Sequence, residues 1–171
     1  MPITPNGEPS MKYALVLLVG LMALTHPSLA SAGALEQRQG WKVIDTMQTF
    51  AALADRLEAA VKANKMAVVT TASASDAAKT QGFTIAGNRV VGVYRNDFAR
   101  RMLQASTTAG IEAPIRFYLV ENPDGTASLG YKMPSTVFQP YMASAGPDLK
   151  VLASELDAIF AKIAEDATRA N

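Results

Sequence analysis

The sequence predicts an α+β fold, a two-layer α/β sandwich with a C-terminal helix packed on the sheet. Three observations carry this prediction. Short runs rich in β-branched residues alternate with helical patterns, a strong turn signal joins two alternating strands, and the chain ends in a long amphipathic pattern. The expected order is roughly β-α-β-α-β-α-β-β-α. A length of 171 residues favours one globular domain, expected over residues 40–167 with a tail at 168–171.

The first half of the domain alternates strands with helices. Bulky and β-branched residues predict three strands, at 41–46, 66–71 and 89–94. Apolar residues at helical spacing predict a helix over 50–64, for which Thr49 is the expected N-cap. A brief helical turn is expected over 73–81.

The second half is expected to hold a hairpin. Residues 115–121 and 126–133 both alternate between apolar and polar side chains, and the sequence Asn-Pro-Asp-Gly at 122–125 favours a tight turn between them. Before the hairpin, Asn96 and Asp97 are expected to cap a helix over 98–106. After it, the Pro- and Ser-rich stretch 135–147 is expected to be a connector.

The last helix is expected over 148–167 and has an apolar seam. Its members share heptad-like spacing: Leu149, Leu152, Leu156, Ile159 and Ile163. Such a seam can pack on the domain's own sheet or pair two copies of the chain. The first interpretation is favoured, and a homodimer is the alternative.

The N-terminus resembles a signal peptide over residues 1–32. Lys12 supplies a positive charge, residues 13–24 form an uncharged apolar run, and Ala30 and Ala32 provide the small residues that signal peptidase requires. The run is shorter than the roughly 20 residues of a membrane span. We therefore expect translation from Met11, cleavage before Gly33, a polar lead over 33–39, no membrane span after processing, and location in the periplasm or outside the cell.

Composition excludes several functions for the processed domain. The chain has no cysteine, and its one histidine, His26, lies in the segment that is expected to be removed. Structural zinc sites, blue-copper sites and Ser-His-Asp or Cys-His catalysis need those side chains. No metal, cofactor or disulfide is therefore expected. A net charge of +1 gives no general attraction to nucleic acid.

Several segments resemble one known family. Residues 102–105 (MLQA) with 109–116 (AGIEAPIR) are similar to the family's "LMQ…AGLDLPLR" pattern, and Glu121 with the following turn is similar to its "VWED-G" hairpin. Tyr131 and Pro134 match its "Y-x-x-P". These residues resemble domain of unknown function 302, over about residues 41–163.

That resemblance implies a compact two-layer α/β domain and no established activity. Two departures stand out. Residues 95–101 replace a segment that often reads "GNP…GT" in the family, with only Asn96 kept, and residues 74–76 replace an "IDH" whose histidine is missing here.

One candidate site emerges where a strand is expected to end. Arg95 and Asn96 lie between the third strand and the next helix, and antiparallel pairing is expected to bring Arg116 close to Tyr131. Guanidinium groups bind carboxylates and phosphates, so the expected ligand is anionic. The alternative interpretation is a solvated face with surface ion pairs.

The sequence therefore favours an exported module that binds a small ligand or an envelope partner. No catalytic set of residues emerges from its motifs. An enzyme that uses no His or Cys chemistry, such as a hydrolase, and a structural accessory protein of the envelope remain the alternatives.

Overall fold

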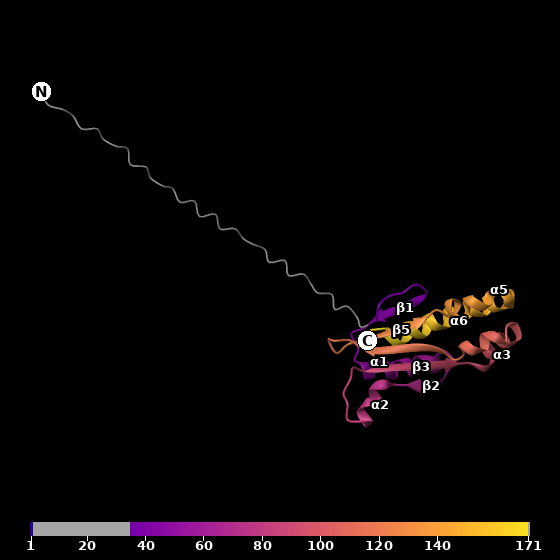
Figure 1. Ribbon diagram of the computed structural model, residues 1–171, viewed down its shortest axis with the longest axis horizontal. Coiled ribbons are helices and arrows are strands. Elements are labelled where there is room, and N and C mark those ends of the chain that lie inside the picture. The colour runs from indigo at the N-terminus through magenta and orange to yellow at the C-terminus, as the bar shows by residue number, and fades with distance from the viewer. Residues whose placement is uncertain (2–34, 171) are drawn as a thin grey trace.

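The computed structural model describes Met1 and residues 35–170 and has a five-stranded antiparallel sheet (Figure 1). The strands lie in the order β1-β5-β4-β3-β2, so the first strand pairs with the last. Their bounds are β1 Trp41–Asp45, β2 Ala67–Ala72, β3 Asn88–Tyr94, β4 Ile115–Glu121 and β5 Ala127–Lys132.

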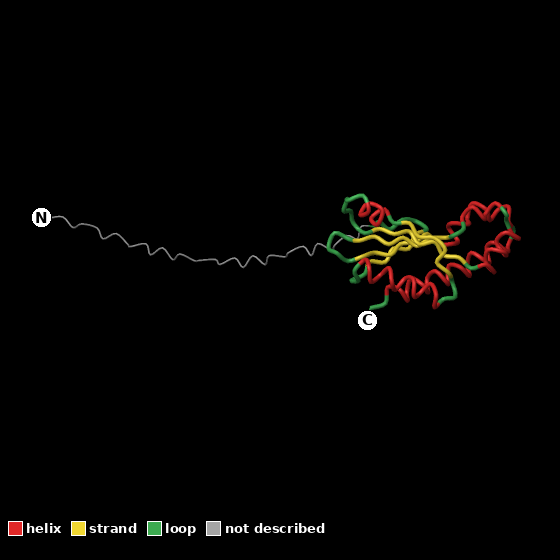
Figure 2. Tube along the Cα trace, turned by 90° about the horizontal axis from the view of Figure 1, so that it is seen from below, coloured by secondary structure: helices red, strands yellow, loops and turns green. Residues whose placement is uncertain are grey.

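The helices form the second layer. α1 and α6 cover one face of the sheet, and no helix formed by residues 35–170 lies over the middle of the other face (Figure 2). This arrangement confirms the predicted two-layer α+β fold. The helical bounds are α1 Phe50–Ala63, α2 Ala74–Thr80, α3 Asn96–Ala105, η1 Thr108–Glu112, α4 Pro134–Phe138, η2 Gln139–Tyr141, α5 Met142–Ala145 and α6 Pro147–Thr168.

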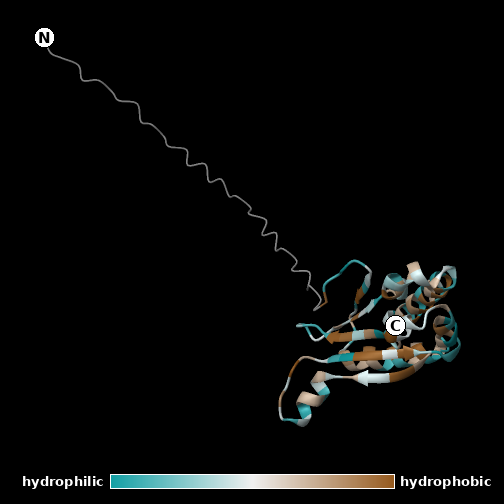
Figure 3. Ribbon diagram, turned by 45° about the vertical axis from the view of Figure 1, so that its right-hand side comes forward, coloured by the Kyte–Doolittle hydropathy of each residue, from teal (hydrophilic) through white to brown (hydrophobic). Residues whose placement is uncertain are grey.

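The core lies between the sheet and these two helices. In Figure 3 the hydrophobic colour is prominent along the strands that contribute to it. The centre of the core is aromatic. The ring of Phe117 from β4 stacks on Phe160 of α6 with centroids 4.7 Å apart, and Tyr131 of β5 meets both rings at 5.2 and 5.7 Å. Aromatic pairs at these separations add about 0.5–1.5 kcal/mol beyond the area that they bury.

The apolar seam of α6 packs inside the domain. Leu149, Leu152 and Ile163 are at most 1 % exposed, and Ile159 is partly buried against the same core. The favoured interpretation of the seam is therefore confirmed. A homodimer through it would first have to expose these side chains, so the seam offers no free surface to a second copy. Among the described residues, no helix combines the length and the apolar character that a membrane crossing requires.

Local chemistry explains where the predicted elements begin. Thr49 precedes α1 and its side chain accepts a hydrogen bond from the backbone N–H of Ala52, as expected of an N-cap. The hairpin turn closes at Gly125, whose φ of 82° favours glycine. The expected signal peptide, with its cleavage residues Ala30, Ala32 and Gly33, lies outside the described residues 35–170.

Two predictions of local structure were wrong. α3 begins at Asn96 and its cap position is Arg95, without a side-chain cap bond, because the carboxylate of Asp97 binds the Arg95 guanidinium instead. The expected connector 135–147 is largely helical, as α4, η2 and α5. Prolines at the starts of α4 and η2 explain this outcome, since proline is pre-organised for the first turn of a helix.

Candidate functional site

The sheet has an open face, which we define as the face turned away from α1 and α6. Residues along β4 alternate between the two faces: Phe117 and Leu119 are fully buried toward the helices, whereas Arg116 is exposed and Tyr118 half-buried on the open face. In the β3–β4 register, Arg116 lies opposite Gly92. The open face therefore places charged and aromatic side chains next to a glycine.

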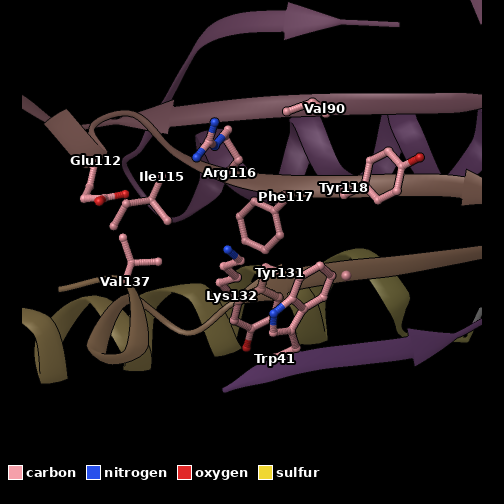
Figure 4. Close-up of a pocket in the computed structure, with 11 residues that line it drawn as sticks. Trp41, Val90, Glu112, Ile115, Arg116, Phe117, Tyr118, Tyr131, Lys132 and Val137 are labelled. Carbon is pink, nitrogen blue, oxygen red and sulfur yellow. The ribbon is translucent and has the colours of Figure 1, made fainter. Parts of the chain in front are cut away.

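A cavity of about 240 Å³ lies where β4 and β5 separate. The two strands pair from Glu121–Ala127 to Phe117–Tyr131, and the pairing does not continue to Arg116 and Lys132. Lys132 pairs with Trp41 of β1 instead. The separation of the two strands gives access from the open face to the side chains between them, as Figure 4 shows.

The wall of this cavity is mainly apolar and aromatic. The side chains of Phe117 and Tyr131 belong to its buried side, and those of Trp41 and Tyr118 to its open side. The complete lining consists of Trp41, Val90, Glu112, Ile115, Arg116, Phe117, Tyr118, Gly130, Tyr131, Lys132 and Val137. Such a wall, with a few polar groups, is typical of a small-molecule site.

Two cations flank the cavity. Arg116 and Lys132 are both exposed, and the Lys132 ammonium lies 5.7 Å from the centroid of the Trp41 ring. Within residues 35–170 neither cation has a carboxylate at ion-pair distance. The cavity therefore has a positive mouth that no acidic side chain of the described chain neutralises directly.

One carboxylate also lines the cavity. Glu112 ends η1, and its Oε1 accepts a hydrogen bond of 2.7 Å from the hydroxyl of Tyr141. This bond, together with desolvation, raises the pKa of the Tyr141 hydroxyl. The hydrogen bond links η1 to η2 and holds one oxygen of the Glu112 carboxylate in place.

Leu35 reaches the same surface from the N-terminal lead. A Cβ atom added to Gly130 would lie 2.9 Å from the Leu35 Cδ1 atom, so the leucine packs on the bare backbone of β5. The lead is held further by Gln37, whose side-chain amide donates a 2.7 Å hydrogen bond to the carbonyl of Trp41. The lead therefore borders the cavity on the open face.

The four predicted site residues divide into two pairs. Arg116 and Tyr131 line the cavity, although from opposite faces, because Tyr131 is 5 % exposed and packs in the core. Burial is the main cause that raises the pKa of the Tyr131 hydroxyl. The other pair, Arg95 and Asn96, does not line this cavity.

Arg95 lies at the same end of the sheet but has its own partners. Its guanidinium binds both carboxylate oxygens of Asp97, at 2.7 and 3.1 Å, and lies 4.3 Å from the centroid of the Phe98 ring. The hydrogen bond from Arg95 is the main cause that lowers the pKa of Asp97. Arg95 therefore pairs locally and does not line the cavity that Arg116 borders.

Sequence reasoning missed three important lining residues: Trp41, Glu112 and Lys132. A signal for Lys132 was present, because it directly follows Tyr131, which stands as far after the predicted turn as Arg116 stands before it. Trp41 could not be found in that way, since its position depends on the pairing of β1 with β5.

The sequence and the fold agree on the family. The family model described as "Domain of unknown function DUF302" matches residues 42–167. The chain belongs to the DUF302 family. The match covers every strand and helix of this DUF302 domain except the first residue of β1 and the end of α6.

A solved DUF302 structure shares the fold. The crystal structure of the uncharacterized conserved protein DUF302 from Bacillus stearothermophilus is 19 % identical in sequence, with a TM-score of 0.66. The similarity covers 77 % of this chain and 100 % of that chain. No curated protein matches the chain.

Proposed function

We propose that this DUF302 domain binds a small organic anion with an apolar body in the cavity between β4 and β5. The observation that carries the proposal is the combination of an aromatic cavity with two exposed cations at its mouth, Arg116 and Lys132, which form no ion pair with any described carboxylate. An apolar body would displace water from the aromatic wall. A carboxylate would neutralise the mouth, and guanidinium groups bind carboxylates in a planar fork.

The size of the cavity limits the ligand. An apolar protein cavity of about 150 Å³ accepts benzene, and sites for drug-sized ligands start near 300 Å³. A volume of about 240 Å³ therefore suits one aromatic ring with a short side chain. 3-Phenylpropanoate has these features and serves as the probe.

Trp41 provides the measurement, because it is the only tryptophan of the chain and lines the cavity. We expect 3-phenylpropanoate to change its fluorescence saturably. Arg116→Ala and Lys132→Ala should each weaken binding about tenfold, the lower end of what a charge-assisted hydrogen bond contributes.

Matched controls are Arg100→Ala and Lys150→Ala, which remove exposed cations of the same type outside the cavity. They should leave binding unchanged. An equal loss of affinity in the control variants would show that the net charge of the protein, and not the two cations at the cavity, determines binding. Absence of saturable binding to the unchanged protein would refute the proposed function.

We also propose that the domain works in the periplasm or outside the cell. The apolar run 13–24 and the small residues Ala30 and Ala32 support export, and the family match begins only at residue 42, after the expected signal peptide. The intact mass of the protein recovered from the producing cell should correspond to a chain that begins at or near Gly33. Recovery of a chain that still contains residues 13–24 would contradict export.

A further inference from the structure

We infer that the ligand of this cavity is a 2-hydroxy carboxylic acid with an apolar side chain. This inference rests on the proposed function and specifies the ligand class. The observation behind it concerns Glu112, the one acidic residue among the lining residues. A simple carboxylic acid bound by the two cations would form no contact with this side chain.

The formal charges of the lining define the net charge of the ligand. Arg116 and Lys132 contribute two positive charges and Glu112 one negative charge, which leaves an excess of one. A monoanion neutralises that excess. A ligand with two carboxylates would turn the excess positive charge of the lining into an excess negative charge close to Glu112, and like charges at close range repel each other.

Glu112 also has an oxygen available for a donor. Its Oε1 accepts the Tyr141 hydroxyl at 2.7 Å, and no described residue donates to Oε2. The carboxyl end of the side chain is turned toward the other lining residues in Figure 4. A carboxylate can only accept hydrogen bonds, so a ligand that displaces water from Oε2 has to supply the donor itself. A neutral hydroxyl does this without disturbing the charge balance.

The order of residues along β4 places that hydroxyl beside the acid group. Glu112 lies just before β4, Arg116 is the second residue of the strand, and Tyr118 is the next residue on the open face. Figure 4 shows the same order, with Glu112 at one side of the two cations and Tyr118 and Trp41 toward the other. A carboxylate held by the cations therefore has Glu112 on one side and the aromatic wall on the other, which fits a hydroxyl next to the carboxylate and an apolar group beyond it.

Three probes of similar size test the inference on the purified protein by Trp41 fluorescence and calorimetry. The first is 3-phenylpropanoate and the second is its 2-hydroxy derivative, phenyllactate. The third is 3-(4-hydroxyphenyl)propanoate, an isomer of phenyllactate that carries the hydroxyl at the far end of the ring. Phenyllactate should bind about tenfold more tightly than the other two, as expected for a hydrogen bond to a charged acceptor.

Two variants assign the preference to Glu112. Glu112→Ala should abolish the advantage of phenyllactate, whereas Tyr141→Phe, which removes the same internal hydrogen bond but keeps the carboxylate, should preserve it. Equal affinity for phenyllactate and 3-phenylpropanoate, tighter binding of the 4-hydroxy isomer, or an unchanged preference in Glu112→Ala would overturn the inference and leave the proposed function standing. If none of the three acids binds, the proposed function fails together with it.

Discussion

Gly92 occupies a position on the open face that leaves no room for a side chain. A Cβ atom there would collide with the Thr70 hydroxyl and would lie 2.8 Å from the Pro114 Cγ atom. Thr70 belongs to β2 and Pro114 directly precedes β4, and these two strands flank β3, so the glycine lets the chain before β4 lie close to the sheet. Arg116 pairs opposite Gly92, and the close approach therefore helps to define where the cavity residues lie.

Replacing this glycine should destabilise the fold. We expect Gly92→Ala to lower the free energy of unfolding by about 1–3 kcal/mol, because overpacking displaces neighbouring backbone. Urea denaturation measures the change. Thr70→Ala in the same chain removes one of the two collisions and should recover part of the loss. A Gly92→Ala protein as stable as the unchanged one would show that the neighbours move aside freely.

At the scale of elements, structure that is determined by a few neighbouring residues could be predicted. Structure that depends on which of two local interactions a residue forms could not. The hairpin followed from alternation and a turn sequence, and β4 has the predicted bounds, Ile115–Glu121. The stretch 135–147 was misjudged because its proline and serine content suggested a loop, whereas Pro134 and Pro140 occupy first-turn positions that tolerate proline. The prediction that Asp97 helps to cap α3 was wrong for a similar reason, since the Arg95 guanidinium binds its carboxylate.

The start of α1 allows a direct test at this scale. Thr49→Ala removes the side-chain acceptor for the Ala52 N–H and should lower the free energy of unfolding by about 1 kcal/mol. Thr49→Ser keeps an acceptor oxygen and should cost only a few tenths of that amount. Thermal or urea unfolding distinguishes the two variants. Equal losses would assign the role of Thr49 to its methyl group rather than to the cap.

At the scale of the whole molecule, the two-layer class was predictable but the order of strands was not. Periodicity indicates which residues form strands, and it contains no information on which strands pair over long distances. The pairing of β1 with β5 brings Trp41 beside Lys132 and completes the mouth of the cavity. Of the four predicted site residues, Arg116 and Tyr131 line the cavity, and the local hairpin was enough to bring them together. Arg95 and Asn96 do not line it, and the local pairing of Arg95 with Asp97 was not foreseen from the sequence.

The contact between Leu35 and Gly130 has a practical consequence for anyone who produces this protein. Leu35 lies on the open face beside the cavity, while the last helical turn, at Thr168, belongs to the helix layer on the opposite side of the sheet. An affinity tag fused a few residues before Leu35 would be tethered next to the mouth, and a polyhistidine or acidic tag there could compete with an organic acid for Arg116 and Lys132. A tag placed after Thr168 is tethered to the other layer, and it is the better choice for a binding assay.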